Sequence, residues 1–241
     1  MKYLYEKDKD KKMTLYCFSP TVMILTFITE ICLAIYAFIK SREKKSDLVI
    51  VLTLVFLALF QLAEYQICDG SNLILWSRIG FVAITFLPVL GIYLITKLNK
   101  KSYLFHFGII VSIIFAFIFI FMPNSLENAS CTGNYIIFDV NSAIMKFYGY
   151  YYFGFLLLGI WESIKGIKNE ENKEKVKTAF KWFIIGYLSF ILPLTIVYII
   201  IPATRVAVES IMCGFAVIFA FILTFKIAPI YYENVKCEWK Q

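Results

Sequence analysis

A polar stripe near residue 60 carries the side chains best suited to chemistry. Gln61, Glu64, Tyr65 and Cys68 follow an almost pure hydrocarbon run, LVIVLTLVFLAL, at spacings of three and four residues. On a helix of about 3.6 residues per turn these positions share one face. A carboxylate facing lipid would be costly, so the stripe must face other helices or a wet cavity. The stripe therefore predicts a ligand-cavity wall, a proton relay or catalytic group, or an ion pair that fixes helix register.

Arg78 is the predicted partner of Glu64. The link DGSN between two neighbouring apolar segments is so short that the segments must form an antiparallel helical hairpin. Glu64 lies five residues before this link and Arg78 six after it, which places both about 7–9 Å below the same membrane boundary. The planar guanidinium of arginine matches a carboxylate in two-point fashion. We expect a Glu64–Arg78 ion pair with Gln61, Tyr65 and Trp76 beside it.

Glu30 is the second acid inside an apolar segment. It lies near the expected middle of the bilayer, with Thr26 one turn before it. Because no basic residue is expected at that depth, Glu30 should be protonated and hydrogen-bonded. Glu30 is therefore the residue at which we expect any proton handling.

The remaining residues form no recognisable catalytic or cofactor set. The six cysteines lack CxxC and Cys/His spacings, which disfavours a zinc site. A single histidine, His106, is too few for bis-histidine haem, a di-iron centre or a multi-histidine zinc site. Lys226 lies almost at the end of the last apolar segment, whereas a retinal-binding lysine lies in mid-membrane. We predict no metal, no cofactor and no enzymatic activity.

Cysteine positions predict one disulfide. Cys17, Cys68 and Cys131 are expected at the extracytoplasmic face, where disulfides form in most cells. All three pairings are open, with one thiol left over. Cys68–Cys131 is favoured because it would pin the link 123–143 to the helical hairpin. Cys213 is interpreted as a small hydrophobe inside a span. Glu209, at the start of the last span, is expected to reach the membrane interface.

Composition identifies the class of protein that holds these residues. The 241-residue chain is 60% hydrophobic, against about 45–50% for soluble domains, so it has too little polar surface for a soluble core. A transmembrane helix needs about 20 mostly apolar residues. We predict an all-α seven-transmembrane-helix bundle as a single domain, 19–230, between tails 1–18 and 231–241. The seven predicted spans are 19–39, 48–68, 73–97, 103–122, 144–164, 178–201 and 207–228.

Charge predicts the orientation of the spans. Fifteen Lys and Arg residues follow spans one, three, five and seven, whereas one, Arg205, follows spans two, four and six. Positive charge stays cytoplasmic, so the C-terminus is expected inside and the N-terminus outside, against the pull of five lysines in the N-terminal tail. The net charge of +7 is then mostly this bias, and no nucleic-acid partner is expected.

Two prolines and one long link complete the expected architecture. Pro88 and Pro193 fall in mid-span, where each should kink its helix or act as a gating hinge. The link 123–143 contains CTGN followed by YIIF, which predicts a short β-hairpin over the mouth of the bundle.

The first two segments resemble a known group of proteins. Cys17-Phe18-Ser19 opens the first span, and Gln61-Leu62-Ala63-Glu64 lies in the second. This pattern resembles an uncharacterised family of small prokaryotic integral-membrane proteins, although here a charged extension precedes the motif. More loosely, the second and third segments resemble the seven-helix sensor module of some prokaryotic histidine kinases. Those resemblances imply a multi-pass protein of the prokaryotic cytoplasmic membrane whose output passes to a separate partner.

The leading functional prediction is a sensor or receptor-like membrane module. It would bind a small or lipidic ligand in a cavity walled by the polar stripe, Arg78, Trp76 and the link 123–143, and a shift of the last three helices would signal to a cytoplasmic or membrane partner. A proton-coupled carrier using Glu30 is the alternative, and a structural subunit of a membrane complex is the third. The lipid bilayer is a partner in every case.

Overall fold

The computed structural model describes residues 19–99, 103–132 and 135–235. The predicted tail 1–18, with Cys17, lies outside them. Seven helices of the described chain are long and apolar enough to cross a membrane, which confirms the seven predicted spans. The elements in chain order are α1 (Pro20–Lys44), α2 (Val49–Cys68), α3 (Leu73–Asn99), α4 (Tyr103–Phe121), β1 (Leu126–Cys131), β2 (Ile136–Val140), α5 (Ser142–Lys168), α6 (Glu174–Ile200), the 3₁₀ segment η2 (Pro202–Ala207), α7 (Val208–Ile222), the π-helical segment η3 (Leu223–Ile227) and α8 (Ala228–Asn234).

The last span is longer than predicted. Instead of ending near 228, the apolar stretch runs as Arg205–Asn234 and includes α7, η3 and α8. Pro229 follows the π-helical turn inside this continuous span, and it cannot donate a backbone hydrogen bond to the preceding turn. The predicted tail 231–241 therefore begins inside α8.

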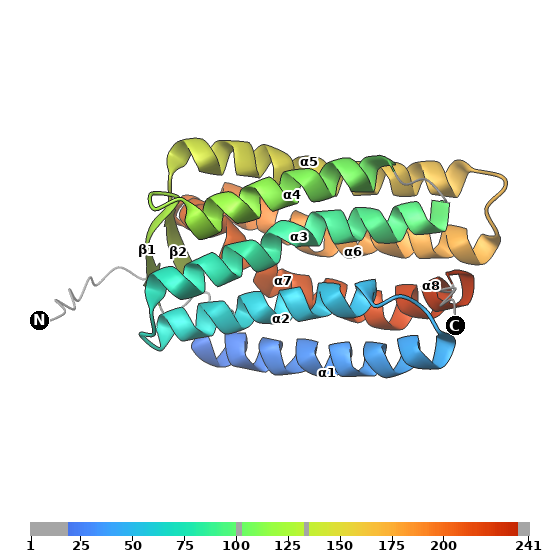
Figure 1. The fold of residues 1–241 in the computed structure, drawn as a ribbon, viewed down its shortest axis with the longest axis horizontal. Coiled ribbons are helices and arrows are strands. Elements are labelled where there is room, and N and C mark those ends of the chain that lie inside the picture. Colours follow the sequence, from blue (N-terminus) through green and yellow to red (C-terminus); the bar gives the residue numbers. More distant parts are fainter. Residues whose placement is uncertain (1–18, 100–102, 133–134, 236–241) are drawn as a thin grey trace, which may run out of the picture.

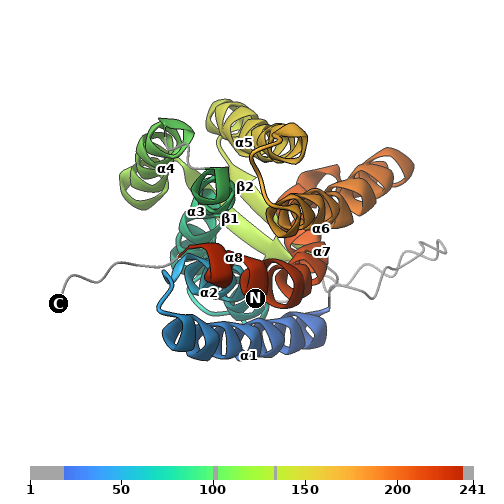
Figure 2. The same ribbon diagram turned by 90° about the vertical axis from the view of Figure 1, so that its right-hand side faces the viewer.

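The helices form a bundle closed by α7. Helix α1 packs on α2, α2 packs on α3, and α3 packs on α4. Helix α5 contacts α3 much more than it contacts α4. The chain then continues through α5, α6 and α7, and α7 contacts α1 and α2. Seen along the bundle, α3 and α7 lie between the other helices (Figure 2). Side chains of α7 thus meet those of the first two helices inside the protein.

The two ends of the bundle differ in structure. At one end β1 and β2 pair as an antiparallel hairpin, with Cys131 opposite Ile136 and Leu126 opposite Val140, and contact α2, α3 and η2 (Figure 1). This end is called the hairpin end, and it confirms the hairpin predicted in the link 123–143. At the opposite end α1, α3 and α5 terminate and α8 lies (Figure 1), and the links there carry most of the lysines. It is called the lysine-rich end.

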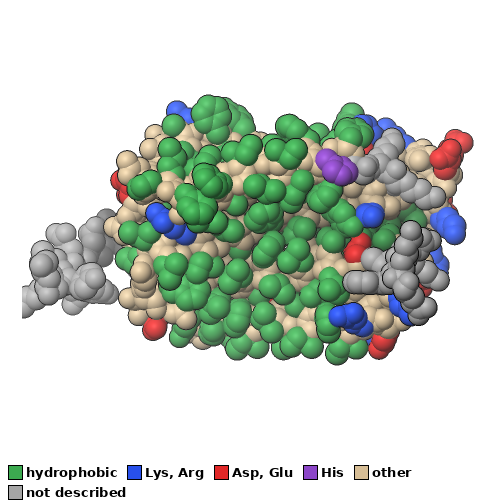
Figure 3. Space-filling view, in the orientation of Figure 1, with side chains coloured by type: hydrophobic (Ala, Val, Ile, Leu, Met, Phe, Trp, Pro, Cys, Tyr) green, Lys and Arg blue, Asp and Glu red, His purple; other side chains and the backbone are tan. Residues whose placement is uncertain are grey.

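Hydrophobic side chains cover the flank of the bundle. In Figure 3 they spread over the middle of the face, and charged side chains gather toward the two ends. Many large apolar side chains of the described helices are exposed. Phe107, Phe117 and Leu157, for example, have exposed fractions of 62–63%. An apolar belt between two charged ends is the surface that a bilayer solvates.

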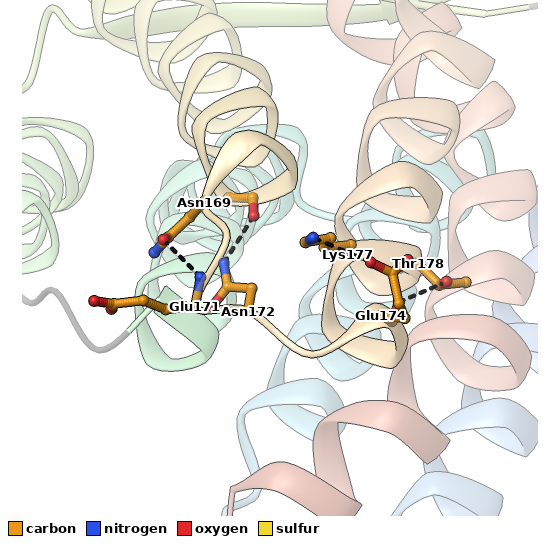
Figure 4. Close-up of polar contacts among 7 residues, drawn as sticks. Asn169, Glu171, Asn172, Glu174, Lys177 and Thr178 are labelled. Atoms are coloured by element: carbon orange, nitrogen blue, oxygen red, sulfur yellow. Dashed lines mark hydrogen bonds and ion pairs between the residues drawn. The ribbon is translucent and has the colours of Figure 1, made fainter.

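The α5–α6 link shows how the lysine-rich end is held. The Asn172 side-chain amide donates to the Gly166 carbonyl at 2.7 Å and to the Asn99 side chain at 3.2 Å. Beyond the link, Lys177 pairs with Glu174 at 3.0 Å in the first turn of α6 (Figure 4). The asparagine closes α5 and ties it to the end of α3, so this turn is fixed by polar contacts rather than by burial.

Both mid-span prolines lie inside continuous helices. α3 runs through Pro88 and α6 through Pro193. A proline deprives the preceding helical turn of a donor, and in a membrane the freed carbonyls need a partner. Pro88 leaves the Ile84 carbonyl without its helical donor. In the same turn α5 supplies a polar contact, because Tyr151 donates to the neighbouring Thr85 carbonyl at 2.5 Å and lies 2.9 Å from the Ser112 hydroxyl. The hinge role of both prolines stays a prediction.

Candidate functional site

The predicted Glu64–Arg78 ion pair is wrong. Arg78 donates from Nη1 to the Ile120 carbonyl of α4 at 3.0 Å, and no ion pair within the described residues joins it to Glu64. The Glu64 carboxyl instead hydrogen-bonds to Ser210 of α7. The short link does set the two residues at similar depth, but Glu64 faces α7 and Arg78 faces α4. Depth along a helix is fixed by residue number, whereas direction around it depends on which neighbours pack there.

Three buried carboxyl groups lie within electrostatic range of one another on α1, α2 and α7, which contact each other. Glu30 is 0% exposed, Glu64 1% and Glu209 7%. Glu64 interacts electrostatically with both of the others, and all three act on the buried Cys213 of α7. Each carboxyl comes from a different helix, so any relative movement of these helices changes the distances between like charges.

Ser210 connects this carboxyl cluster to the β-hairpin. Its hydroxyl accepts a hydrogen bond from the Ile136 N–H of β2 at 3.2 Å and bonds to the Glu64 carboxyl. Ser210 is 1% exposed, so both bonds are shielded from water. One hydroxyl therefore links α7 to α2 and to the first residue of β2.

The carboxyl cluster lacks compensation within the part of the chain that the structure describes. Both oxygens of Glu30 and Oε1 of Glu64 are buried with no hydrogen-bond partner there, and none of the described ion pairs includes a residue of the cluster. Isolated carboxylates are expensive to bury. The described His, Cys, Asp and Glu residues include no group of three placed to hold a metal ion. Protons are thus the simplest positive charge that the cluster can take up or release.

A pocket opens beside the cluster, beneath the β-hairpin. It has a volume of about 390 Å³, within the range of small-molecule sites. It lies between the hairpin and the start of α7, and its charged walls are Arg205, Glu209 and Asp139. Because Glu209 belongs to both the pocket and the carboxyl cluster, a ligand here would lie next to the buried acids. This cavity is named the hairpin pocket.

The disulfide holds the hairpin over the bundle. Cys68 at the end of α2 is bonded to Cys131 at the end of β1, which is the pairing favoured from the sequence. Since β1 and β2 supply much of the pocket wall, the bond fixes one side of the hairpin pocket to α2.

The other predicted site residues lie near the acids but not in the pocket. Gln61 is buried one turn from Glu64, and Thr26 is buried one turn from Glu30 with its hydroxyl donating to the Val22 carbonyl. Tyr65 and Trp76 are partly buried against the hydrophobic core, and neither lines the hairpin pocket. The predicted cavity wall is therefore corrected: the pocket is built by the hairpin and α7 rather than by α2 and α3.

Sequence reasoning missed Glu209 and Ser210 of α7, and it also missed Asp139 of β2 and Arg205 of η2, which line the hairpin pocket. Glu209 was expected to reach the membrane boundary from the end of its span, and Cys213 was interpreted as a plain hydrophobe. Glu209, Ser210 and Cys213 fall at spacings of one and four residues in an otherwise apolar segment, so two of them share a helix face. That pairing of an acid and a thiol one turn apart is the signal available in the sequence.

A small internal cavity continues from Cys213 toward the lysine-rich end. It has a volume of about 30 Å³ and is lined by Cys213, Thr53 and Tyr187 among mostly apolar residues. The Tyr187 hydroxyl is buried without a hydrogen-bond partner in the described chain. A space of this size holds about one or two waters, one of which would satisfy this hydroxyl.

Comparison with family models, with curated proteins and with solved structures gives no match for this chain. The function must therefore be argued from the hairpin pocket, the carboxyl cluster and the way α7 joins them.

Proposed function

We propose that this chain is a receptor-like membrane module that binds a small polar ligand in the hairpin pocket and signals to a partner at its lysine-rich end. The hairpin end would face the extracytoplasmic side of a prokaryotic cytoplasmic membrane. The strong bias of Lys and Arg toward the opposite links supports this orientation, and a disulfide at the hairpin end fits an oxidising compartment. The resemblance of the second and third helices to sensor modules supports the same class.

The ligand chemistry follows from the pocket walls. Arg205 supplies a cation, and Glu209 and Asp139 supply anions, across a cavity that is otherwise amide, hydroxyl and apolar. Charges of both signs favour a compact ligand that itself carries both signs. A zwitterion such as a free amino acid is the simplest ligand with this property.

One observation carries the proposal: α7 begins in the pocket wall and is bonded to its surroundings at both ends. At the pocket, Ser210 bonds to β2 and to Glu64. At the far end of the same span, the Tyr231 hydroxyl donates to Asp47 at 2.8 Å and the Tyr232 hydroxyl donates to the Ala37 carbonyl at 3.2 Å. A ligand that displaces the start of α7 therefore acts on a segment anchored at the lysine-rich end.

Thermal unfolding of the purified protein in nanodiscs tests the proposal, with free amino acids as zwitterionic probes and their C-terminal amides as cationic controls. A binding amino acid at about 100 times its Kd should stabilise the folded protein by about 2.7 kcal/mol. Arg205→Gln should abolish the shift. Lys146→Gln removes an exposed cation from the same end outside the pocket and should preserve it. Equal loss in both variants, or stabilisation by no zwitterion, would contradict the proposal.

A proton-coupled carrier is the second candidate, and Glu30 favours it. Its two oxygens are fully buried without a partner in the described chain and interact electrostatically with Glu64, which suits a group that exchanges a proton during transport. Amino-acid uptake into proteoliposomes driven by a pH gradient tests this function. Uptake that is abolished in Glu30→Gln supports the carrier, and binding without uptake supports the receptor.

A further inference from the structure

A second open cavity lies at the lysine-rich end, far from the hairpin pocket. It is a groove of about 240 Å³ between α1 on one side and η3 with α8 on the other. Lys40 and Lys44 stand on the α1 wall, and Tyr232 and Glu233 stand on the α8 wall. This cavity is named the α1–α8 groove.

The groove has an excess of positive charge. Glu233 is paired at 3.0 Å with Lys175 of α6, which lies outside the groove, so its charge is already compensated. Lys40 forms an ion pair with Glu43 at 2.8 Å. Because both side chains are exposed to solvent, this pair is weak. Lys44 takes part in none of the ion pairs of the described chain. Two ammonium groups thus face the groove with little opposing charge, and they favour an anionic occupant.

The helix geometry explains why a groove opens here. The span changes from α-helix to the π-helical segment η3 just before α8, and Thr224 of that segment lines the groove. Single π-helical turns widen a helix locally and are frequent at functional sites. The Tyr232 hydroxyl donates to the Ala37 carbonyl at 3.2 Å, which closes the back of the groove and holds its two walls together.

The surroundings require an occupant with a hydrocarbon part. Tyr36, which lines the groove, has its ring 5.6 Å from that of Phe225, and the two residues are 43% and 49% exposed on the apolar flank. Nearby, Lys226 lies over the Trp182 ring at 5.3 Å, and Trp and Lys side chains of this kind mark the membrane–water boundary. The groove therefore opens at the boundary, with its cations toward water and its aromatic edge toward acyl chains.

We propose that the α1–α8 groove binds an anionic phospholipid. Its phosphate headgroup lies between Lys40 and Lys44, and an acyl chain lies along Tyr36 and Phe225. Basic recesses between transmembrane helices are suited to such headgroups. The site is separate from the hairpin pocket and does not depend on the receptor function. Its occupant bridges α1 and α8, so it also stabilises the joint at which the last span meets the first two helices.

Native mass spectrometry of the full chain, titrated with phosphatidylglycerol or phosphatidylcholine, tests this site. Phosphatidylglycerol should bind more tightly than phosphatidylcholine. Each lysine near a phosphate contributes about a fivefold factor, so the double variant K40Q/K44Q should bind phosphatidylglycerol about thirtyfold more weakly. K40R/K44R should restore most of the affinity, since the charge is kept.

The matched control is K168Q/K173Q. It removes two exposed lysines at the same end that do not line the groove, and it should bind phosphatidylglycerol like the wild type. Equal weakening by K40Q/K44Q and K168Q/K173Q would overturn the site, as would equal affinity for the two lipids. Glycerol phosphate without acyl chains should not compete at equal concentration. If it does, the groove is a soluble-anion site and the lipid proposal fails.

Discussion

At the hairpin half of the bundle, Glu30 and Glu64 are buried with oxygens that no described group satisfies, whereas at the lysine-rich end Asp47 accepts two tyrosine hydroxyls. Tyr231 donates to Asp47 at 2.8 Å and Tyr93 at 3.3 Å. Both regions hold acidic residues between helices, but one is left uncompensated and the other is saturated with donors.

The difference indicates where the protein can change and where it is held. A carboxylate with charged-group hydrogen bonds stabilises one arrangement of its helices, by about 1.5–3 kcal/mol for each bond. Carboxyl oxygens without partners, such as both of Glu30 and Oε1 of Glu64, stabilise no particular arrangement, and the electrostatic interaction between the two groups depends on helix position. The Asp47 site therefore anchors α8, and under the proposed function the carboxyl cluster between α1, α2 and α7 is the part that responds to the hairpin pocket.

Breaking the Cys68–Cys131 disulfide should have the largest effect on stability. The bond closes a loop across 63 residues of sequence, and loss of such a bond costs about 2–5 kcal/mol in small domains. The double variant C68S/C131S should lower the midpoint of thermal unfolding in nanodiscs, and reductant should lower it in the wild type. Cys32→Ser, at an exposed free cysteine, is the control. A reductant effect of equal size in C68S/C131S would show that the bond is not its cause.

The position of that disulfide illustrates what the sequence could predict. A sequence gives directly the number of residues between two positions. That number predicts the length of each span, the tight turn at DGSN and the place of the turn in the link 123–143. Cys68 and Cys131 were placed at the same end of the bundle by this reasoning alone, and their pairing then needed only proximity.

Directions around the helices could not be predicted in the same way. In a bilayer, lipid-facing side chains are as apolar as those of the core, so hydrophobic patterning does not reveal which helix face points inward. Arg78 was placed at the right depth but toward α2 rather than α4, and Glu209 was placed at a boundary rather than in the interior. The Arg78 error concerns direction around the helix, which depends on how α3 packs against α4. The Glu209 error concerns burial, which depends on what packs against the start of α7.

Removing the anchor should have the next largest effect. Asp47→Ala deletes the acceptor of the Tyr231 and Tyr93 hydroxyls and should lower the free energy of unfolding by about 3 kcal/mol, the lower end for two such bonds, because Asp47 is only half-buried. Asp47→Asn keeps one oxygen acceptor, so its free energy of unfolding should lie between those of the wild type and Asp47→Ala. Denaturant unfolding monitored by tyrosine and tryptophan fluorescence measures the change. Glu170→Ala, at an exposed acid of the same end, should change little, and an equal loss there would remove the contrast between the two ends.

Removing charge from the carboxyl cluster should have the smallest effect, and of opposite sign. Glu30→Gln deletes no hydrogen bond of the described chain, because both Glu30 oxygens lack partners, and it removes an acid that interacts electrostatically with Glu64. We expect unfolding to become more difficult by up to about 1 kcal/mol, because the unfavourable interaction between the two buried acids is lost. Glu64→Gln and the double variant E30Q/E64Q complete a double-mutant cycle. The stabilisation by Glu30→Gln should be smaller in the Glu64→Gln background, where the second acid is absent. If Glu30→Gln instead destabilised the protein as much as Asp47→Ala, both acids would be structural anchors. The uncompensated cluster would then have no part in coupling the hairpin pocket to α7.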